Sequence, residues 1–202
     1  MFKIIMPQKS TFNTLQLKVT LLETNPLVWR EIWLPATHSF YQLHLAVQAA
    51  FGWENSHLFQ FCKTGMSDED SIGIPNDDFL VTDARKVTLN KMIRKPGDHL
   101  IYIYDFGDHW EHQIDLEAVT NNEAHIALCV NGAAECPPEN VGGIGGYERM
   151  LEELRSGTRE ERKQYRDWLG LSANQKWNPE YYNQREINKR MYLLSPEKFT
   201  FG

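Results

Sequence analysis

The stretch YDFGDHWEHQIDLE, residues 104–117, decides the fold because it predicts an antiparallel β-hairpin around a glycine turn. Residues 99–105 and 110–119 alternate apolar and polar side chains, and a period of two is typical of a strand. Gly107 and Asp108 suit the tight two-residue loops that join paired strands. These two segments therefore give the clearest hairpin prediction in the chain.

The turn also sets an expected register. It places Asp105 opposite Trp110 and Ile103 opposite His112, and a four-residue loop gives the same pairing. His112 then lies on the apolar face of the hairpin, with Asp105 as its diagonal neighbour. A buried carboxylate is costly unless it is paired, so we expect Asp105 and His112 to interact. Two interpretations stay open: a catalytic or metal-binding imidazole oriented by a carboxylate, or a satisfied polar pair that fixes the hairpin.

The segments around this hairpin indicate an α+β fold. Further strands are expected at residues 14–23, 28–35, 57–63 and 125–132, which gives a mostly antiparallel sheet of about five to six strands. Residues 64–80 resemble an acidic loop. Residues 85–95 fit either a short strand or one helical turn.

One helix is expected to pack on the sheet, and others follow it at the C-terminal end. Ser39 with Gln42 fits a capping box ahead of the first helix, and Gly52 is a suitable stop. Asn178 and Pro179 suit the start of the last helix. We expect a single domain with a sheet core over residues 1–146 and a helical extension over 147–202 packed on it.

Composition limits the function classes. The formal net charge of −6 does not favour nucleic acid as a partner, because a surface that neutralises phosphates is rich in lysine and arginine. Charges of mixed sign on the C-terminal helices are typical of a solvated surface. No apolar run reaches the length of about 18 residues that crosses a membrane, and no signal peptide is evident. Three cysteines without a framework of pairs indicate a reducing, cytoplasmic location.

Several side chains are of the types that form sites. Asp105 and His112 are the candidate catalytic pair, and His112, Cys129 and Cys136 are candidate ligands of a transition metal such as zinc. The alternative for the cysteines is a pair of buried thiols, since their spacing is not that of a structural zinc module. A glycine-rich loop, 141–148, enters a helix and could hold an anion or simply turn the chain. The candidate binding residues are His57, Trp110, Glu139 and Tyr147.

Five motifs in this order resemble the plasmid pRiA open-reading-frame-three-like family. They are PLVWREIWLP (26–35), FGWENSHLFQF (51–61), IYIYDFGDHWEHQIDLE (101–117), CVNGAAECPPENVGGIGGYERML (129–151) and WNPEYYNQREINKRM (177–191). The resemblance spans Leu15 to Met191 and implies an α+β domain of unassigned function, related to plasmid and transposon passenger proteins. Two positions depart from the pattern of the family: Phe59 stands where many relatives have histidine, and Asn140 where they have aspartate.

Three functions stay open at this stage. The first is a cytoplasmic binding or adaptor domain for a protein or a small molecule. The second is a hydrolytic or nucleic-acid-processing enzyme that uses Asp105 and His112, with or without a metal. The third is a DNA-binding accessory protein of resolvase type, which the net charge does not favour.

Overall fold

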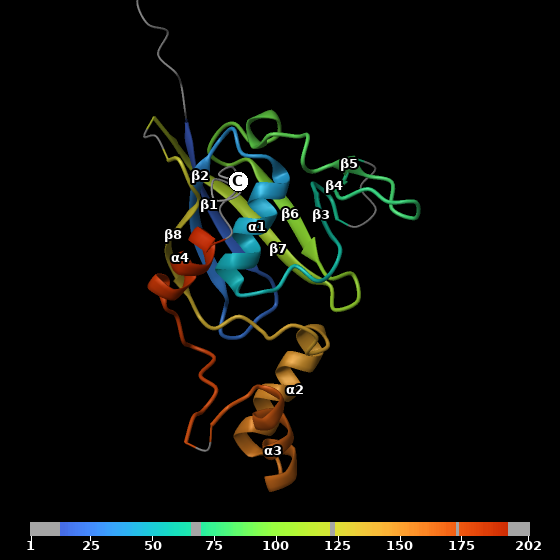
Figure 1. The fold of residues 1–202 in the computed structure, drawn as a ribbon, viewed down its shortest axis with the longest axis vertical. Coiled ribbons are helices and arrows are strands. Elements are labelled where there is room, and N and C mark those ends of the chain that lie inside the picture. Colours follow the sequence, from blue (N-terminus) through green and yellow to red (C-terminus); the bar gives the residue numbers. More distant parts are fainter. Residues whose placement is uncertain (1–12, 66–69, 122–123, 173, 194–202) are drawn as a thin grey trace, which may run out of the picture.

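A computed structural model describes residues 13–65, 70–121, 124–172 and 174–193, and these form one mixed sheet with α-helices (Figure 1). Within the described residues the sheet has eight strands, in the order β5-β4-β3-β6-β7-β1-β2-β8. Every neighbouring pair is antiparallel except β4 and β5, which are parallel. The predicted α+β class is confirmed, although the sheet is larger than expected.

The additional strands come from short segments that sequence periodicity does not reveal. The strands are β1 (Thr14–Leu21), β2 (Trp29–Pro35), β3 (Phe59–Cys62), β4 (Ile72–Gly73), β5 (Thr82–Asp83), β6 (His99–Tyr104), β7 (Trp110–Thr120) and β8 (Leu128–Ala133). β4 and β5 have two residues each, so no alternation can mark them, and β4 lies within the expected acidic loop. The ambiguous segment 85–95 contains a 3-10 turn, η1 (Leu89–Lys91).

Helix α1 (Phe40–Phe51) covers one face of the sheet (Figure 1). Its predicted start is confirmed, because Ser39 and Gln42 form both hydrogen bonds of a capping box. It ends at Gly52, whose φ of 85° is the left-handed conformation that glycine adopts at low cost. Nine of its twelve residues are buried, so this helix closes the main core.

The expected register of the β6–β7 hairpin is wrong by one residue. Tyr102 pairs with His112, and Tyr104 pairs with Trp110. The connection is a five-residue loop whose end residues, Asp105 and His109, both have a φ of 54°. A shift of one residue moves side chains to the opposite face of a strand. Both tyrosines therefore join His112 in the buried face of the sheet.

Three helices follow the sheet: α2 (Gly143–Ser156), α3 (Arg159–Trp168) and α4 (Gln184–Leu193). The predicted start of the last helix at Asn178 is wrong, because α4 begins after Asn183. The Oδ1 of Asn183 accepts hydrogen bonds from the amides of Arg185 and Glu186, which suits the first turn of a helix.

The C-terminal helices take two positions. α4 lies beside α1 and β8, where the Nε of Arg190 donates to the carbonyl of Ala49 and Asn188 bonds the backbone of Cys129. α2 and α3 form a helical lobe that projects from one end of the sheet (Figure 1). The boundary at residue 146 stays a prediction. Among the described residues, no helix combines the length and apolar character needed to cross a membrane.

Candidate functional site at the hairpin tip

Three loops meet at the tip of the β6–β7 hairpin and bring together three of the predicted site residues. His57 comes from the segment before β3, Asp105 follows β6, and Glu139 lies in the loop before α2. The Nε2 of His57 is 3.5 Å from Oδ2 of Asp105 and 3.7 Å from Oε2 of Glu139. We call these three residues the tip cluster.

Asp105 is fixed by its own turn. Its φ of 54° is uncommon for a non-glycine residue, and aspartate tolerates it better than most. Its Oδ1 accepts hydrogen bonds from the amides of Gly107, at 2.9 Å, and Asp108, at 3.3 Å. Its own amide donates to the carbonyl of Leu58. With Oδ1 engaged in the turn, Oδ2 is the oxygen that faces His57.

Glu139 is fixed by donors from two other segments. Its Oε1 accepts from the amide of Glu54 at 2.6 Å and from the hydroxyl of Tyr104 at 2.9 Å. Its Oε2 accepts from the Oγ of Ser56 at 2.6 Å. Burial raises the pKa of Tyr104 to about 12, so this phenol keeps its proton and remains a donor. The carboxylate is therefore held in one orientation.

His57 completes the tip cluster and is its most accessible member. Its Nε2 lies 3.0 Å from the Oδ1 of Asn140 as well as near both carboxylates. All three neighbours accept hydrogen bonds, so Nε2 carries a proton. In the neutral ring Nδ1 is then an acceptor. The side chain is 31 % exposed, whereas those of Asp105 and Glu139 are 11 % and 13 % exposed.

The predicted glycine-rich anion site is taken by a side chain of the protein itself. The amide of Gly142 donates to Oδ2 of Asp108 at 3.1 Å, at the N-terminus of α2. Gly143 has a φ of 64°, and a Cβ there would lie 2.5 Å from the carbonyl oxygen of Asp108. Glycine is needed for this close approach, which locks the hairpin tip to the start of the helical lobe.

His112 lies outside the tip cluster, so the expected Asp105–His112 contact is absent. Its ring is fully buried and lies edge-on to Phe51 and Trp53. Its Nδ1 is 3.1 Å from the carbonyl oxygen of Trp110 and 3.3 Å from that of Tyr102. Burial lowers the pKa of His112 to about 3, which keeps the ring neutral. The physical reason is the register: His112 points into the core from the middle of β7, whereas Asp105 lies in the loop.

The aromatic candidates also lie in the core. Trp110 is buried and packs near Trp53, with ring centroids 5.9 Å apart. Tyr147 is buried on α2, and burial raises its pKa to about 12. Neither side chain is exposed enough to contact a ligand from solvent in this conformation. Their roles as binding residues stay predictions.

The candidate metal ligands are not gathered into one site. Cys129 is buried on β8, where its Sγ lies 3.3 Å from the carbonyl of Asn131. Cys136 is buried in the loop before α2, and burial raises the pKa of both thiols. Within the described ranges, no group of three or more His, Cys, Asp or Glu side chains has the arrangement to hold a metal ion.

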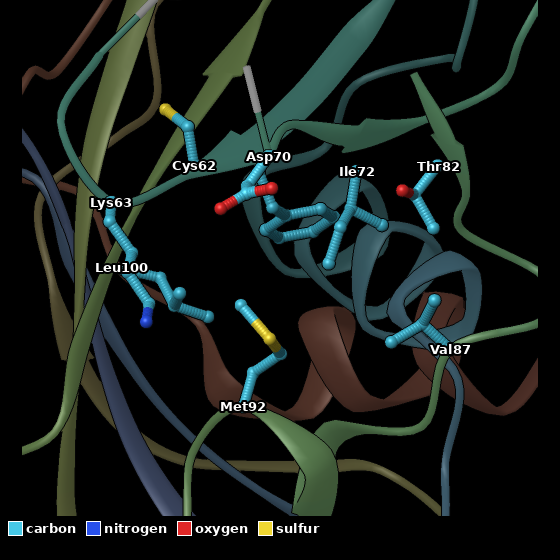
Figure 2. A pocket seen from close by; sticks show the side chains of 9 residues that line it. Cys62, Lys63, Asp70, Ile72, Thr82, Val87, Met92 and Leu100 are labelled. Atoms are coloured by element: carbon cyan, nitrogen blue, oxygen red, sulfur yellow. The ribbon is translucent and has the colours of Figure 1, made fainter. Parts of the chain in front are cut away.

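A separate cavity of about 330 Å³ is lined by residues of β3, β4, β5 and β6 and by Val87 and Met92 on either side of η1. Figure 2 shows Ile72, Val87, Met92 and Leu100 around it, with Lys63 and Asp70 at its polar side. None of the residues predicted to form a site lines this cavity. Its apolar wall and few polar groups are typical of a small-molecule pocket, but it lies away from the tip cluster.

Three contributors to the tip cluster were not among the predicted site residues. Ser56, Tyr104 and Asn140 hold or contact Glu139 and His57. For Asn140 the sequence offered one indication of a role in a site, since this residue stands where relatives of the family have aspartate. No feature of the sequence pointed to Tyr104, because only the observed register of β6 and β7 turns its ring toward the loop that carries Glu139.

Comparisons with known proteins agree with the resemblance in the sequence. The model of the family "Plasmid pRiA4b ORF-3-like protein" matches residues 13–186. An uncharacterized protein, y4hQ of Sinorhizobium fredii, is 36 % identical over 166 residues, which cover 79 % of this chain and 82 % of the relative. The crystal structure of MM3350, a protein of unknown function from Methanosarcina mazei, matches with a TM-score of 0.74 and 30 % identity. That match covers 88 % of this chain and 98 % of the other.

Proposed function

The chain belongs to the plasmid pRiA4b ORF-3-like family, and we propose that it is a cytoplasmic binding domain that holds a cationic ligand at the tip cluster. One observation carries the proposal. His57, Asp105 and Glu139 converge from three loops, with the His57 Nε2 3.5 Å and 3.7 Å from the two carboxylates. The cytoplasmic location rests on buried thiols outside any disulfide. By resemblance, the domain is related to passenger proteins of plasmids and transposons.

The charge of the tip cluster selects the ligand class. Two carboxylates against one imidazole attract an amine or a guanidinium group and repel an anion. In the neutral ring the Nδ1 of His57 accepts a hydrogen bond, which an N–H donor supplies. Both carboxylates are held by backbone and hydroxyl donors before any ligand arrives. This preorganisation lowers the entropy cost of binding.

Space for the rest of the ligand adjoins the tip cluster. A pocket of about 390 Å³ is lined by Asn140, the hydrogen-bond partner of His57, and by residues of α2 and α3. Tyr165 and Trp168 supply aromatic surface in it, while the charges of Glu153 and Arg149 offset each other. Aromatic faces attract cations, so it is the aromatic part of this pocket that suits the same ligand class.

An acid–base enzyme is the second candidate, with His57 in place of the predicted His112. The observation that favours it is an imidazole whose Nε2 is hydrogen-bonded to the Oδ1 of Asn140 with two carboxylates within 3.7 Å, since fixed polar neighbours orient an imidazole for proton transfer. Against it, the Oγ of Ser56 donates to Glu139 and not to the imidazole, so the adjacent hydroxyl is not activated as a nucleophile.

The test is ligand-induced stabilisation with agmatine, which carries a guanidinium and an amine, and with citrate as the anionic comparison. We expect agmatine to raise the melting temperature of the wild-type protein and citrate to leave it unchanged. The agmatine effect should disappear in Glu139→Gln. Glu117→Gln is the matched control, because Glu117 is an exposed acid on the same sheet.

Two results would count against the binding proposal. One is the absence of any stabilisation by agmatine and by related amines. The other is an equal loss of stabilisation in the Glu117→Gln control. Hydrolysis of p-nitrophenyl acetate or bis(p-nitrophenyl) phosphate that is lost in His57→Gln would favour the enzyme instead.

A further inference from the structure

We propose that a basic groove in the helical lobe binds single-stranded nucleic acid. The groove has a volume of about 1130 Å³ and lies between α2, α3 and the segment that leads to α4. It is separate from the tip cluster, and none of its lining residues belongs to the cluster. We call it the basic groove. Its cationic side chains are Arg155, Arg159, Arg162, Lys163, Arg166 and Lys176.

The charges of α3 are sorted by face, although they alternate in the sequence. Arg159, Arg162, Lys163 and Arg166 all line the basic groove. Their spacing of i, i+3, i+4 and i+7 places them on one side of a helix. The acidic residues of α3, Glu160, Glu161 and Asp167, do not line it. The mixed composition of this helix therefore hides a basic stripe.

Among the described residues, part of this positive charge is held by neutral groups and not by carboxylates. Arg155 pairs with Glu152, and Lys163 pairs with Asp167. Arg162 instead donates to the carbonyl of Gly157. A neutral carbonyl orients a guanidinium without cancelling its charge.

Arg159, on α3, and Lys176, on the segment that leads to α4, add two further exposed cations to the basic groove. Six cations against the two carboxylates that line it, Glu148 and Glu152, make the groove positive. The total charge of the chain is −6, so the surface elsewhere is negative. A polyanion is therefore drawn to this groove and repelled from the rest of the molecule.

The floor of the basic groove favours a single strand over a duplex. Trp177, Leu151, Leu154 and Leu171 line it together with the cations. The bases of a duplex are paired and stacked inside the double helix. Its phosphates would contact the arginines, but no base would contact the apolar floor of the groove. A single strand presents both phosphates and unstacked bases. Bases stack on an aromatic ring such as that of Trp177 whatever the sequence.

Arginine spacing favours a nucleic acid over an acidic peptide. Arg159, Arg162 and Arg166 follow one another about one helical turn apart, roughly 5 Å along the axis. A regular line of planar guanidinium groups matches a chain with a phosphate in every unit. An acidic peptide has carboxylates only where its sequence supplies them.

The experiment measures fluorescence anisotropy of a labelled oligothymidylate of about 20 nucleotides, long enough for a complete site. We expect binding by the full-length protein that weakens between about 50 and 200 mM salt. Arg159→Gln with Lys176→Gln should weaken binding roughly tenfold. The slope of log K against log salt should fall by about 1.4, since each lost phosphate contact on a single strand contributes about 0.7.

Lys91→Gln with Lys95→Gln is the matched control, because both lysines are exposed near the sheet and the charge change is the same. This control should bind like the wild type, and so should His57→Gln, which disables the tip cluster alone. The proposal is overturned by the absence of salt-dependent binding or by an equal loss in the control. Equal affinity for a duplex, or tighter binding of polyglutamate than of oligothymidylate, would also overturn it.

Discussion

At the scale of single residues, the imidazole of His112 is held by core contacts that Asp105 does not share. His112 packs against Phe51 and Trp53, whereas Asp105 supports the loop amides of Gly107 and Asp108. The two side chains therefore contribute to stability through separate sets of contacts. Such contributions add when residues share no partner.

The first prediction is that Asp105→Ala and His112→Ala are additive. His112→Ala should cost about 2–4 kcal/mol because it leaves a cavity in the core. Asp105→Ala should cost about 1–2 kcal/mol because two loop amides lose their acceptor. Urea denaturation of the wild type, both single variants and the double variant measures the coupling. A coupling energy above about 1 kcal/mol would contradict the observed register.

The second prediction is loss of stability in mild acid. Burial lowers the folded-state pKa of His112 to about 3 and that of His44 to about 4, below the ordinary value of 6.5. The unfolded chain therefore binds protons at pH values where the folded chain does not. Stability is fully present above pH 6.5 and falls as the pH decreases toward the folded-state values.

Each such histidine contributes up to about 1.36 kcal/mol per pH unit within that window. Denaturant midpoints measured between pH 7.5 and pH 4.5 would report this dependence. His112→Gln should make the dependence shallower, because glutamine does not titrate, whereas His44 still contributes. His99→Gln serves as the control, since His99 is exposed, and it should follow the wild-type curve. A wild-type midpoint that does not change over this range would show that these histidines are not buried in solution.

At the scale of secondary-structure elements, Arg30 joins β2 to α1 and to the loop after β8. Its side chain is 3 % exposed and lies 5.3 Å from the ring centres of Phe51 and Tyr182. Burial lowers its pKa from the ordinary value of 12.5, but an arginine remains charged at neutral pH. The guanidinium donates to four backbone carbonyls, those of Trp29, Ala50, Ala133 and Ala134.

The third prediction is that Arg30→Lys destabilises the protein by about 2–4 kcal/mol. A lysine ammonium cannot reach carbonyls that lie in the fork geometry of a guanidinium, so buried acceptors lose their donors. Thermal and urea unfolding measure the loss. Arg85→Lys is the control, because Arg85 is largely exposed and its exchange should change stability by less than about 0.5 kcal/mol. Equal effects of the two exchanges would show that the Arg30 network does not persist in solution.

Local signals predicted the elements whose contacts are local. The capping box of Ser39 and Gln42 lies within one turn of chain, and α1 starts where it indicates. The prediction of the β6–β7 register was wrong because Asp105 and His109 both adopt a positive φ, which lengthens the loop to five residues. Alternation of side chains does not encode that choice. Because the observed register differs from the expected one by a single residue, Asp105 and His112 do not meet in the fold.

The tip cluster could be predicted only in part for a related reason. His57, Asp105 and Glu139 were recognisable as site residues by their type. Their convergence depends on long-range contacts such as the hydrogen bond from Tyr104 to Glu139. No local pattern specifies which loops meet. The basic groove could not be predicted from the sequence for the same reason, because only the folded lobe shows which face of α3 lies against its neighbours.

At the scale of the whole molecule, the chain combines a closely packed sheet with a more loosely held helical lobe. The core includes α1, where nine of twelve residues are buried. In α3 no residue is buried. Elements with few buried apolar contacts open with free energies below that of global unfolding. The candidate binding surfaces lie at the tip of the sheet and in this lobe, and not in the core.

The fourth prediction is that α3 exchanges its amide hydrogens through local opening. Hydrogen-exchange mass spectrometry should show peptides from residues 159–168 exchanging much faster than peptides from residues 40–51 in α1, a helix of similar length. α1 is the internal control, since both helices have capping boxes and differ chiefly in burial. Equal protection of the two helices would show that α3 is buried against something in solution, such as a second copy of the chain. Faster exchange in α3 would instead identify it as an element that binding can stabilise, because occupation of the basic groove adds contacts that the isolated helix lacks.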